Sequence, residues 1–406
     1  MRFVHTADTH IGASHHGRTE REDDFREAFS EMIERTLELA PDAFVHAGDL
    51  FDKHRPSVKD IHFAANELMR LIRNNIEVIL LPGNHDRRSV RGELAPQSIL
   101  ELLGAKVFSL AEGKSLYRVN DVELWGIPYI GDADTLRGLI SDMAEKARSP
   151  AVLVLHQYIY PPARLLPLLY PDDIPPVFSY AALGHWHIPY IGERYAYPGS
   201  TETKQLSSEE ASVEKRCFYL VEMDDNSLRI EPHYLLSPRP FFYLECTEED
   251  IAAKMIGLRE KMGKSPKKPM LKIKLSGGPR MRADEVVDSA LLSAGLKRKD
   301  FLLISTDTTR QEVARSRASQ AKEARSDAAE RFFGNDPELL GVVLAMREAI
   351  IKAESERESS GTRARSDREA ILRSAKEAAE QYLKEKADAS VKTASEKLSE
   401  PQGNRG

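Results

Sequence analysis

The 406-residue sequence has only two cysteines, Cys217 and Cys246. Two thiols are too few for a disulfide framework and lack the close spacing of a thiolate metal site, so we expect ordinary core residues. The sequence also lacks a run of roughly 18 to 20 apolar residues, the length that spans a bilayer. Its first residues, MRFVHTADTH, do not have the pattern of a signal peptide. A disulfide-rich scaffold is excluded, and we expect no membrane span and a cytoplasmic location.

An excess of one charge is also absent, because 58 Lys and Arg residues stand against 64 Asp and Glu residues, a formal net charge of −6. Composition therefore does not mark the whole chain as a nucleic-acid-binding protein. The charge is unevenly distributed, however, since residues 254–282 contain ten Lys or Arg residues and a single acid, Glu260. Such a segment is either a solvated surface or a phosphate-binding surface.

Apolar strands alternate with helical segments in the first part of the chain. Apolar residues recur at helical spacing within residues 19–39, 61–72 and 97–103. Short apolar stretches between and after them, such as AFVH, EVILL and AVLVL, indicate buried strands. This alternation predicts a layered α/β domain. Pro238 and Pro240 mark a boundary, so we expect this domain to comprise residues 1–236.

Two further regions follow this domain. Residues 241–304 contain two strand patterns, FFYLEC and MLKIKL, and two helical patterns, which predict a smaller α/β domain. From residue 306 to residue 406 the composition shifts to Ala, Arg, Glu and Ser, which is typical of exposed helix or disorder. Residues 339–351 and 371–383 of this charged tail each contain an apolar stripe at helical spacing.

Side chains that can bind metals or transfer protons follow the apolar strands directly. They occur in the motifs DTH, GDLFD, GNHD and GHWH, and at the end of AVLVLH. Because such folds build their sites at the carboxyl ends of strands, we expect these side chains to converge. The candidates are Asp8, His10, Asp49, Asp52, Asn84, His85, His156, His185 and His187.

The types of these side chains indicate which ions would bind. Carboxylate, imidazole and amide ligands suit Mn²⁺, Fe²⁺ or Zn²⁺, and differ from the all-oxygen cages of Ca²⁺. The candidates are more than one small ion needs, so two metals bridged by one carboxylate are the simpler interpretation. Such a pair can acidify a water, clamp phosphate oxygens and neutralise charge, which favours phosphoester hydrolysis.

The ordered motifs D-x-H, GDxxD, GNHD, a single later His and G-H-x-H resemble those of the calcineurin-like metallophosphoesterase superfamily. Within it, HTADTHIG, GDLFDKHRPS, PGNHD and GHWH are similar to the DNA double-strand-break repair nucleases of the SbcD/Mre type, including archaeal members. The motifs cover residues 5–187, and YPGSTE with the smaller domain extends the resemblance to about residue 304. The resemblance implies a layered β-sandwich flanked by helices, a small α/β capping domain and a helical C-terminal tail.

The resemblance also implies two Mn²⁺ ions per subunit, with Asp49 as the bridging ligand. The ligands of the first ion would be Asp8, His10, Asp49 and His187. Those of the second would be Asp49, Asn84, His156 and His185. His85 would then face the scissile phosphate as a transition-state stabiliser or as a general acid to the leaving oxygen.

Position 52 distinguishes this chain from part of the family. Many archaeal and eukaryotic members have His where this chain has Asp52, whereas bacterial members and many phosphatases have Asp. A carboxylate here could pair with His85, raise its pKa and orient it, which makes Asp52 a second candidate catalytic residue. His54, two residues later, is an alternative source of the missing imidazole.

Five basic residues are candidate contacts to DNA phosphates. Two follow GNHD directly, and three lie in the basic segment of the capping domain. Simple surface charge is the alternative for each of them. The five residues are Arg87, Arg88, Lys264, Lys267 and Lys268.

The resemblance implies two partners besides double- and single-stranded DNA. A second copy of the chain would pack through the helices of residues 60–72 and 97–103 as a two-fold dimer. An SMC-like coiled-coil ATPase of the SbcC type would bind one of the apolar stripes of the tail. The candidate dimer contacts are Phe63, Leu68, Met69, Ile99 and Leu103.

Residues and resemblance together predict a Mn²⁺-dependent nuclease of DNA double-strand-break repair, located with the nucleoid. It would act as a 3′–5′ exonuclease on double strands and as an endonuclease on single strands. Two alternatives remain open. Another calcineurin-like phosphodiesterase or phosphatase would not need the basic domain and the tail, and a non-catalytic scaffold that bridges DNA ends would not need His85.

Overall fold

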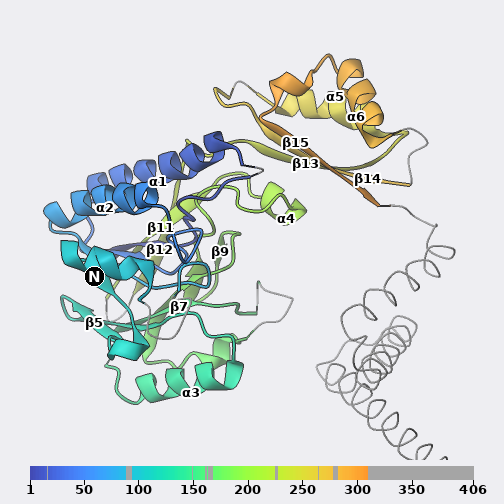
Figure 1. Ribbon diagram of the computed structural model, residues 1–406. Helices are drawn as coiled ribbons and strands as arrows, with labels where there is room; N and C mark the ends of the chain where they lie inside the picture. Colours follow the sequence, from blue (N-terminus) through green and yellow to red (C-terminus); the bar gives the residue numbers. More distant parts are fainter. Residues whose placement is uncertain are drawn as a thin grey trace, which may run out of the picture. The chain divides into compact units, whose positions relative to one another are not determined.

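The computed structural model describes residues 1–309, apart from residues 16, 88–93, 149, 161, 163–167, 225–226, 264 and 278–281. Two six-stranded sheets have helices against their outer faces, and a three-stranded sheet with its own helices forms a smaller unit (Figure 1). This architecture confirms the predicted layered α/β fold. Within the described residues, no helix combines the length and the apolar character needed to cross a membrane.

The first sheet has a parallel centre and an antiparallel edge. Four strands from the N-terminal part of the chain run parallel, and two later strands continue the sheet beside β1 in antiparallel pairing. The register sets Val4 beside Phe44 and Phe44 beside Val78, so that these side chains share one buried face. In sheet order the strands are β12 (Leu228–Tyr234), β11 (Cys217–Met223), β1 (Arg2–Thr6), β2 (Ala43–His46), β3 (Glu77–Leu80) and β4 (Lys106–Val107).

Two long helices, α1 (Thr19–Leu39) and α2 (Val58–Arg73), cover the outer face of this sheet (Figure 1). α1 has the bounds that the apolar spacing predicts, and it buries Phe25, Phe29 and Met32 along one side. α2 begins after Ser57, whose hydroxyl accepts a hydrogen bond from the backbone N–H of Asp60 and so caps the helix. The segment predicted at residues 97–103 is the 3₁₀ helix η1 (Pro96–Leu103).

The second sheet also combines a parallel centre with antiparallel edges. Parallel pairing joins β6, β7, β8 and β10, while β5 and β9 pair in antiparallel fashion at the two edges. One helix, α3 (Ala133–Ala144), begins after the capping residue Asp132 and packs against the outer face. In sheet order the strands are β5 (Leu116–Val119), β6 (Val122–Ile127), β7 (Ala151–His156), β8 (Phe178–Gly184), β10 (Tyr195–Tyr197) and β9 (Tyr190–Ile191).

The inner faces of the two sheets pack against each other through buried apolar side chains. Phe3 and Val45 of the first sheet share one buried cluster with Val152, Val154 and Tyr180 of the second. Residues of the central strands are therefore apolar on both faces, which explains why their sequences are continuous apolar runs. The result is four layers, helix–sheet–sheet–helix, in which the ends of the central strands are held rigidly.

The smaller unit begins after residue 240. Three parallel strands, β13 (Phe241–Thr247), β14 (Met270–Ser276) and β15 (Leu303–Thr309), carry α5 (Ile251–Lys261) and α6 (Ala283–Ser293) on one face (Figure 1). β15 crosses the boundary expected between residues 304 and 306, because its backbone completes the sheet by pairing with β14 as far as Thr309. The two apolar stripes of the tail lie outside the described residues.

A substitution of Gly126 in β6 would test how closely the second sheet packs against Phe108. A Cβ at this position would overlap the ring of Phe108, so Gly126→Ala should lower the free energy of unfolding by about 1–3 kcal/mol. Gly138, exposed within α3 and without a neighbour near its Cβ position, is the matched control. Gly138→Ala should instead raise stability by about 0.5–1 kcal/mol. Urea unfolding curves measure both changes, and equal midpoints for the two variants would show that Phe108 moves aside at no cost.

Candidate metal centre

The candidate site lies where the central strands of both sheets end. Asp8 and His10 follow β1, Asp49 follows β2, and His156 and His185 end or follow β7 and β8. The backbone there is unusual: of seven non-glycine residues with positive φ among the described residues, four are Asp8, His10, Asp49 and His185. Left-handed backbone of this kind is costly for most side chains and concentrates at functional sites.

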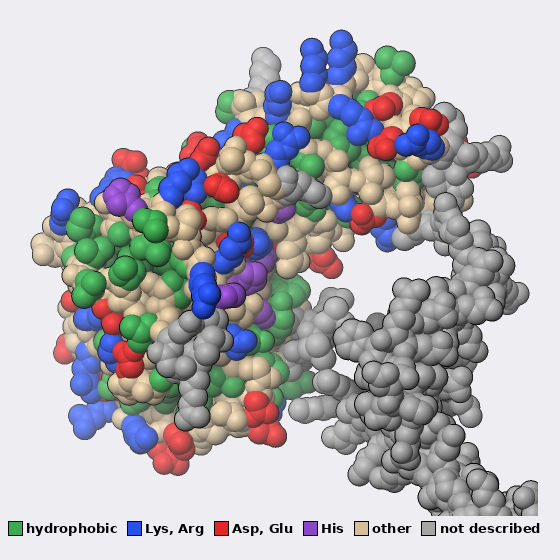
Figure 2. Space-filling view, in the orientation of Figure 1, with side chains coloured by type: hydrophobic (Ala, Val, Ile, Leu, Met, Phe, Trp, Pro, Cys, Tyr) green, Lys and Arg blue, Asp and Glu red, His purple; other side chains and the backbone are tan. Residues whose placement is uncertain are grey.

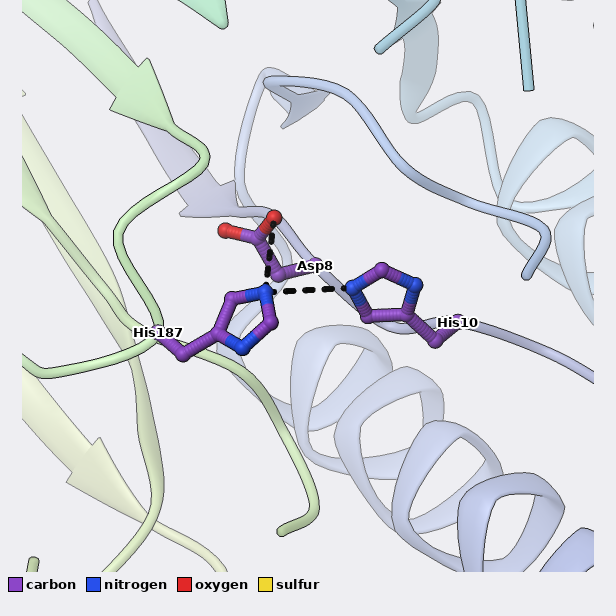
Figure 3. Close-up of side chains that lie close together, drawn as sticks. All are labelled: Asp8, His10 and His187. Atoms are coloured by element: carbon purple, nitrogen blue, oxygen red, sulfur yellow. Dashed lines mark hydrogen bonds and ion pairs between the residues drawn. The ribbon is translucent and has the colours of Figure 1, made fainter. Parts of the chain in front are cut away.

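One cluster brings Asp8, His10 and His187 together (Figure 3). The Nε2 atoms of His10 and His187 are 3.3 Å apart, and Nε2 of His187 is 3.8 Å from Oδ1 of Asp8. Two imidazole nitrogens and a carboxylate oxygen thus point at one small volume. A cation fits this arrangement, because all three atoms can offer it lone pairs.

A second cluster consists of Asp49, His156 and His185, with Asn84 beside it. Nε2 of His156 lies 3.2 Å from Oδ2 of Asp49 and 3.1 Å from Oδ1 of Asn84. The same nitrogen is 3.9 Å from Oδ1 of Asp8, so the two clusters adjoin. The donor set again combines imidazole with carboxylate and amide oxygens, which suits a first-row divalent cation.

Asp49 lies between the two clusters. Its Oδ2 atom is 3.2 Å from Nε2 of His156 in one cluster and 3.8 Å from Nε2 of His10 in the other. Its Oδ1 atom accepts a hydrogen bond of 2.8 Å from the backbone N–H of His85. A single carboxylate therefore contacts both clusters and the GNHD loop, which is the position that a bridging ligand needs.

Burial and mutual charge give the site's groups contrasting pKa values. Burial raises the pKa of Asp8 to about 6 and lowers the pKa of His10 to about 4 and of His185 to about 2. Burial opposes charge on His156 as well, but the carboxylates of Asp49 and Asp8 raise its pKa to about 9. Burial likewise opposes ionisation of Asp49, yet His156 and His10 hold the pKa of this carboxyl below its usual range.

A buried glutamate that the sequence analysis did not single out orients one of the candidate ligands. Oε1 of Glu210, in the short helix α4 (Ser208–Ala211), is 3.1 Å from Nδ1 of His187, and its Oε2 forms a 2.7 Å ion pair with Arg216. Burial alone would raise the pKa of Glu210, but His187 and Arg216 lower it to about 2. A carboxylate that holds the outer nitrogen of a histidine fixes its tautomer for metal binding.

Asp52 has His85 as its expected neighbour and two further partners, His10 and Lys204. Nδ1 of His85 lies 3.0 Å from the backbone carbonyl of Asp52 and 3.9 Å from its carboxylate. Oδ1 of Asp52 lies 3.5 Å from Nδ1 of His10 and forms a 2.6 Å ion pair with Lys204, a residue that the sequence analysis missed. Burial disfavours ionised Asp52, but His10 and Lys204 lower its pKa to about 2. His54 is exposed and belongs to none of the described clusters.

The basic residues predicted to contact DNA have different environments. Arg87 lies over the ring of Tyr129, which itself adjoins His185, so this guanidinium borders the site. Lys267 is half-buried and forms ion pairs with Asp24 (3.1 Å) and Glu27 (2.8 Å), which indicates a structural role. Lys268 is exposed and lines a cavity of about 740 Å³. Arg88 and Lys264 lie outside the described residues.

The histidines of the candidate site lie near the molecular surface. Figure 2 shows histidine side chains gathered on one face, with Lys and Arg side chains beside them. The clustered histidines are partly accessible, because His185 and His187 are half-buried whereas His10 and His156 are fully buried. A ligand can thus reach the clusters from this face.

Comparison with known proteins agrees with the geometry. Residues 1–189 match the calcineurin-like phosphoesterase family. The DNA double-strand break repair protein Mre11 of Thermoplasma acidophilum is 30% identical over 322 residues, which cover 73% of this chain and 84% of that protein. The chain belongs to the Mre11 family. The predicted superfamily and its archaeal branch are thereby confirmed.

Other Mre11 relatives align over shorter parts. The protein of Methanocaldococcus jannaschii is 35% identical over 242 residues, which cover 57% of this chain and 64% of that protein. The protein of Sulfolobus acidocaldarius is 28% identical over 299 residues, which cover 70% of this chain and 77% of that protein. The chain thus spans less than two thirds of the Methanocaldococcus relative's length.

Metal binding to this Mre11 homologue should release a proton at neutral pH. With its pKa raised to about 9, His156 is charged in the metal-free chain at pH 7, whereas a metal ligand must be neutral. Asp8, with a pKa of about 6, is already largely ionised there. Affinity for Mn²⁺ should therefore rise about tenfold from pH 7 to pH 8, with about one proton released per chain.

Calorimetric titration of the chelator-treated chain with Mn²⁺ tests this expectation. Two buffers with different ionisation enthalpies should give binding heats that differ by the heat of protonating about one buffer molecule. The variant His156→Asn should lose this difference. Identical heats for the unaltered chain in both buffers would show that His156 is neutral before the metal binds.

Proposed function

We propose that this Mre11 homologue is a two-metal phosphodiesterase that cleaves DNA in double-strand-break repair. The observation that supports this most is the shared position of Asp49, which contacts both clusters while its other oxygen fixes the loop of His85. Two clusters joined by one carboxylate suit hydrolysis of a phosphodiester. The printed names of the relatives supply the link to DNA repair.

The cation ligands that we propose are those of the two clusters. One Mn²⁺ would be held by Asp8, His10, Asp49 and His187, and the other by Asp49, Asn84, His156 and His185. When bound, the two ions would polarise the phosphate and neutralise the charge that develops on it. The donor set suits Mn²⁺, Fe²⁺ or Zn²⁺, and we propose Mn²⁺ among them because of the resemblance to the repair nucleases.

His85 is the residue that we assign to proton transfer. Its Nδ1 faces the carbonyl oxygen of Asp52 at 3.0 Å, and because a carbonyl only accepts, Nδ1 must be the donor. Nε2 is then the nitrogen available to the substrate, and in the charged imidazole it can donate to the leaving oxygen. The His85 side chain is 37% exposed, so a phosphodiester at the surface can reach it.

We also propose that DNA is cut from double-stranded ends in the 3′–5′ direction and within single strands. Two exposed basic residues suit backbone phosphates: Arg87, which borders the site, and Lys268 of the smaller unit. The partner that we propose for residues 306–406 is an SMC-like ATPase of the SbcC type. The family assignment supports this partnership and a location with the nucleoid.

Cleavage of end-labelled double- and single-stranded DNA tests the proposal. The chain should cut both with Mn²⁺ and neither with excess chelator, and His85→Ala should lower the rate by about a hundred- to ten-thousandfold. His54→Ala, which changes an exposed histidine outside the clusters, should leave the rate unchanged. Hydrolysis of a small phosphodiester without any cutting of DNA would retain the two-metal site and overturn the nuclease.

A homodimer through α2 and η1 is a further part of the proposal. Of the contacts suggested by the sequence, Leu68 is buried in the chain's own core, whereas Ile99 is 48% exposed. Leu102 in η1 and Val58 in α2 are exposed by more than four fifths, so this face presents apolar side chains to solvent.

Substitution of this face should separate the subunits. Leu102→Glu should convert a dimer into a monomer in sedimentation velocity at micromolar concentration, because a carboxylate would be buried against apolar groups. Leu292→Glu changes a similarly exposed leucine of α6 and should leave the dimer intact. A monomeric unaltered chain, or a dimer that survives Leu102→Glu, would contradict the proposed interface.

A further inference from the structure

Lys204 places an ammonium group at the edge of the candidate metal centre. Its Nζ is 2.6 Å from Oδ1 of Asp52, and its side chain is 19% exposed. An ammonium has three hydrogens to donate, and Asp52 is the one partner of Nζ that the described residues provide. Two donors of a fixed cation therefore remain for a ligand that enters from solvent.

The backbone around Lys204 is held on both sides. Its N–H donates to Oε2 of Glu210 (3.0 Å), and its carbonyl accepts from Nε2 of His15 (2.8 Å). The carbonyl of the preceding residue, Thr203, accepts from Arg21 (2.7 Å). These hydrogen bonds hold the backbone that carries the side chain, and Asp52 holds its ammonium, so less entropy is lost when it binds a ligand.

The carboxylate that holds Lys204 also contacts the proposed machinery. Oδ1 of Asp52 is 3.5 Å from Nδ1 of His10 and 3.9 Å from Nδ1 of His85. Glu210 repeats this pattern, because one of its oxygens contacts His187 and the other the backbone of Lys204. Lys204 is thereby fixed relative to both a proposed metal ligand and the proposed proton donor.

The negative charge of the carboxylates at the site explains why an ammonium group would favour binding of an anionic phosphodiester. Asp8 and Asp49 belong to the two clusters described above, and Asp52, which forms a further group of close side chains with His10 and His85, adds a third carboxylate. An anionic substrate would be repelled by an unpaired Asp52 in this partly buried setting. The ammonium of Lys204 neutralises that carboxylate and can also attract the phosphate.

We propose that Lys204 is a substrate-binding residue of this site, whose ammonium, anchored by Asp52, donates to a non-bridging oxygen of the phosphodiester. The proposal rests on the phosphodiesterase function proposed above and adds a residue to it. The chemical class of the ligand is a phosphodiester, whether in DNA or in a small molecule. In this proposal Lys204 neither binds the metals, which are held by the two clusters, nor transfers the proton, which is the role of His85.

Kinetics with bis(p-nitrophenyl) phosphate and with DNA test the role of Lys204. Lys204→Met, which keeps the length and removes the charge, should lower kcat/KM by roughly ten- to a hundredfold, mainly through a higher KM. Lys204→Arg should retain most of the activity. Lys215→Met, at an exposed lysine over Tyr234, is the control and should behave as the unaltered chain.

A double variant separates substrate binding from a merely structural role. If Lys204 only neutralised Asp52, then removing both charges in Asp52→Asn/Lys204→Met would restore the KM lost in Lys204→Met. Phosphate binding predicts that KM stays high. Loss of Mn²⁺ binding in Lys204→Met, recovery of KM in the double variant, or an unchanged KM in Lys204→Met would each overturn the proposal.

The salt dependence of DNA binding gives a second readout. In a His85→Ala background, which prevents cleavage, adding Lys204→Met should make the slope of log Kd against log salt concentration shallower by about 0.7 to 0.9, the value for one lost phosphate contact. Failure of the unaltered chain to cut or bind DNA would count against the nuclease. The small diester would then decide the role of Lys204 alone.

Discussion

The carboxylate of Asp49 is the group on which the rest of the site depends. One oxygen faces His156 and His10, and the other holds the backbone N–H of His85. This arrangement requires the ends of four strands, β1, β2, β3 and β7, to meet within a few ångströms. Gly83 makes the closest approach possible, since a Cβ there would overlap Asp49. Any displacement of β2 relative to β3 or β7 would separate the groups that Asp49 joins.

Holding such a group in place opposes local stability. Asp49 and Asp8 are buried carboxylates, and both have left-handed backbone, so desolvation and conformational strain act at the same positions. The four-layer core offsets these costs, because the strands that end at the site are apolar on both faces. Cations bound at the clusters would offset the remaining repulsion, which links the stability of the fold to metal binding.

The sequence predicted the elements that have strong local patterns. The apolar spacing of residues 19–39 coincides with α1, and the candidate metal-binding motifs do follow the strands. It missed Glu210 and Lys204, because their partners His187 and Asp52 are distant in the chain and no local pattern marks such pairs. The sequence predicted that the Asp52 carboxylate could pair with His85, and these groups are 3.9 Å apart, but the ammonium of Lys204 lies closer, at 2.6 Å.

The basic segment of residues 254–282 shows why a high charge in the sequence does not by itself identify a binding surface. Lys267 belongs to the basic segment, yet its ammonium neutralises Asp24, which also accepts hydrogen bonds from Arg239 and Arg21. Arg21 in turn binds the carbonyl of Thr203, the neighbour of Lys204. The cation count of residues 254–282 therefore overstates the charge available to a phosphate backbone. Basic side chains that form ion pairs with a buried carboxylate such as Asp24 are neutralised and stabilise the loops. Only the exposed, unpaired cations can attract a polyanion.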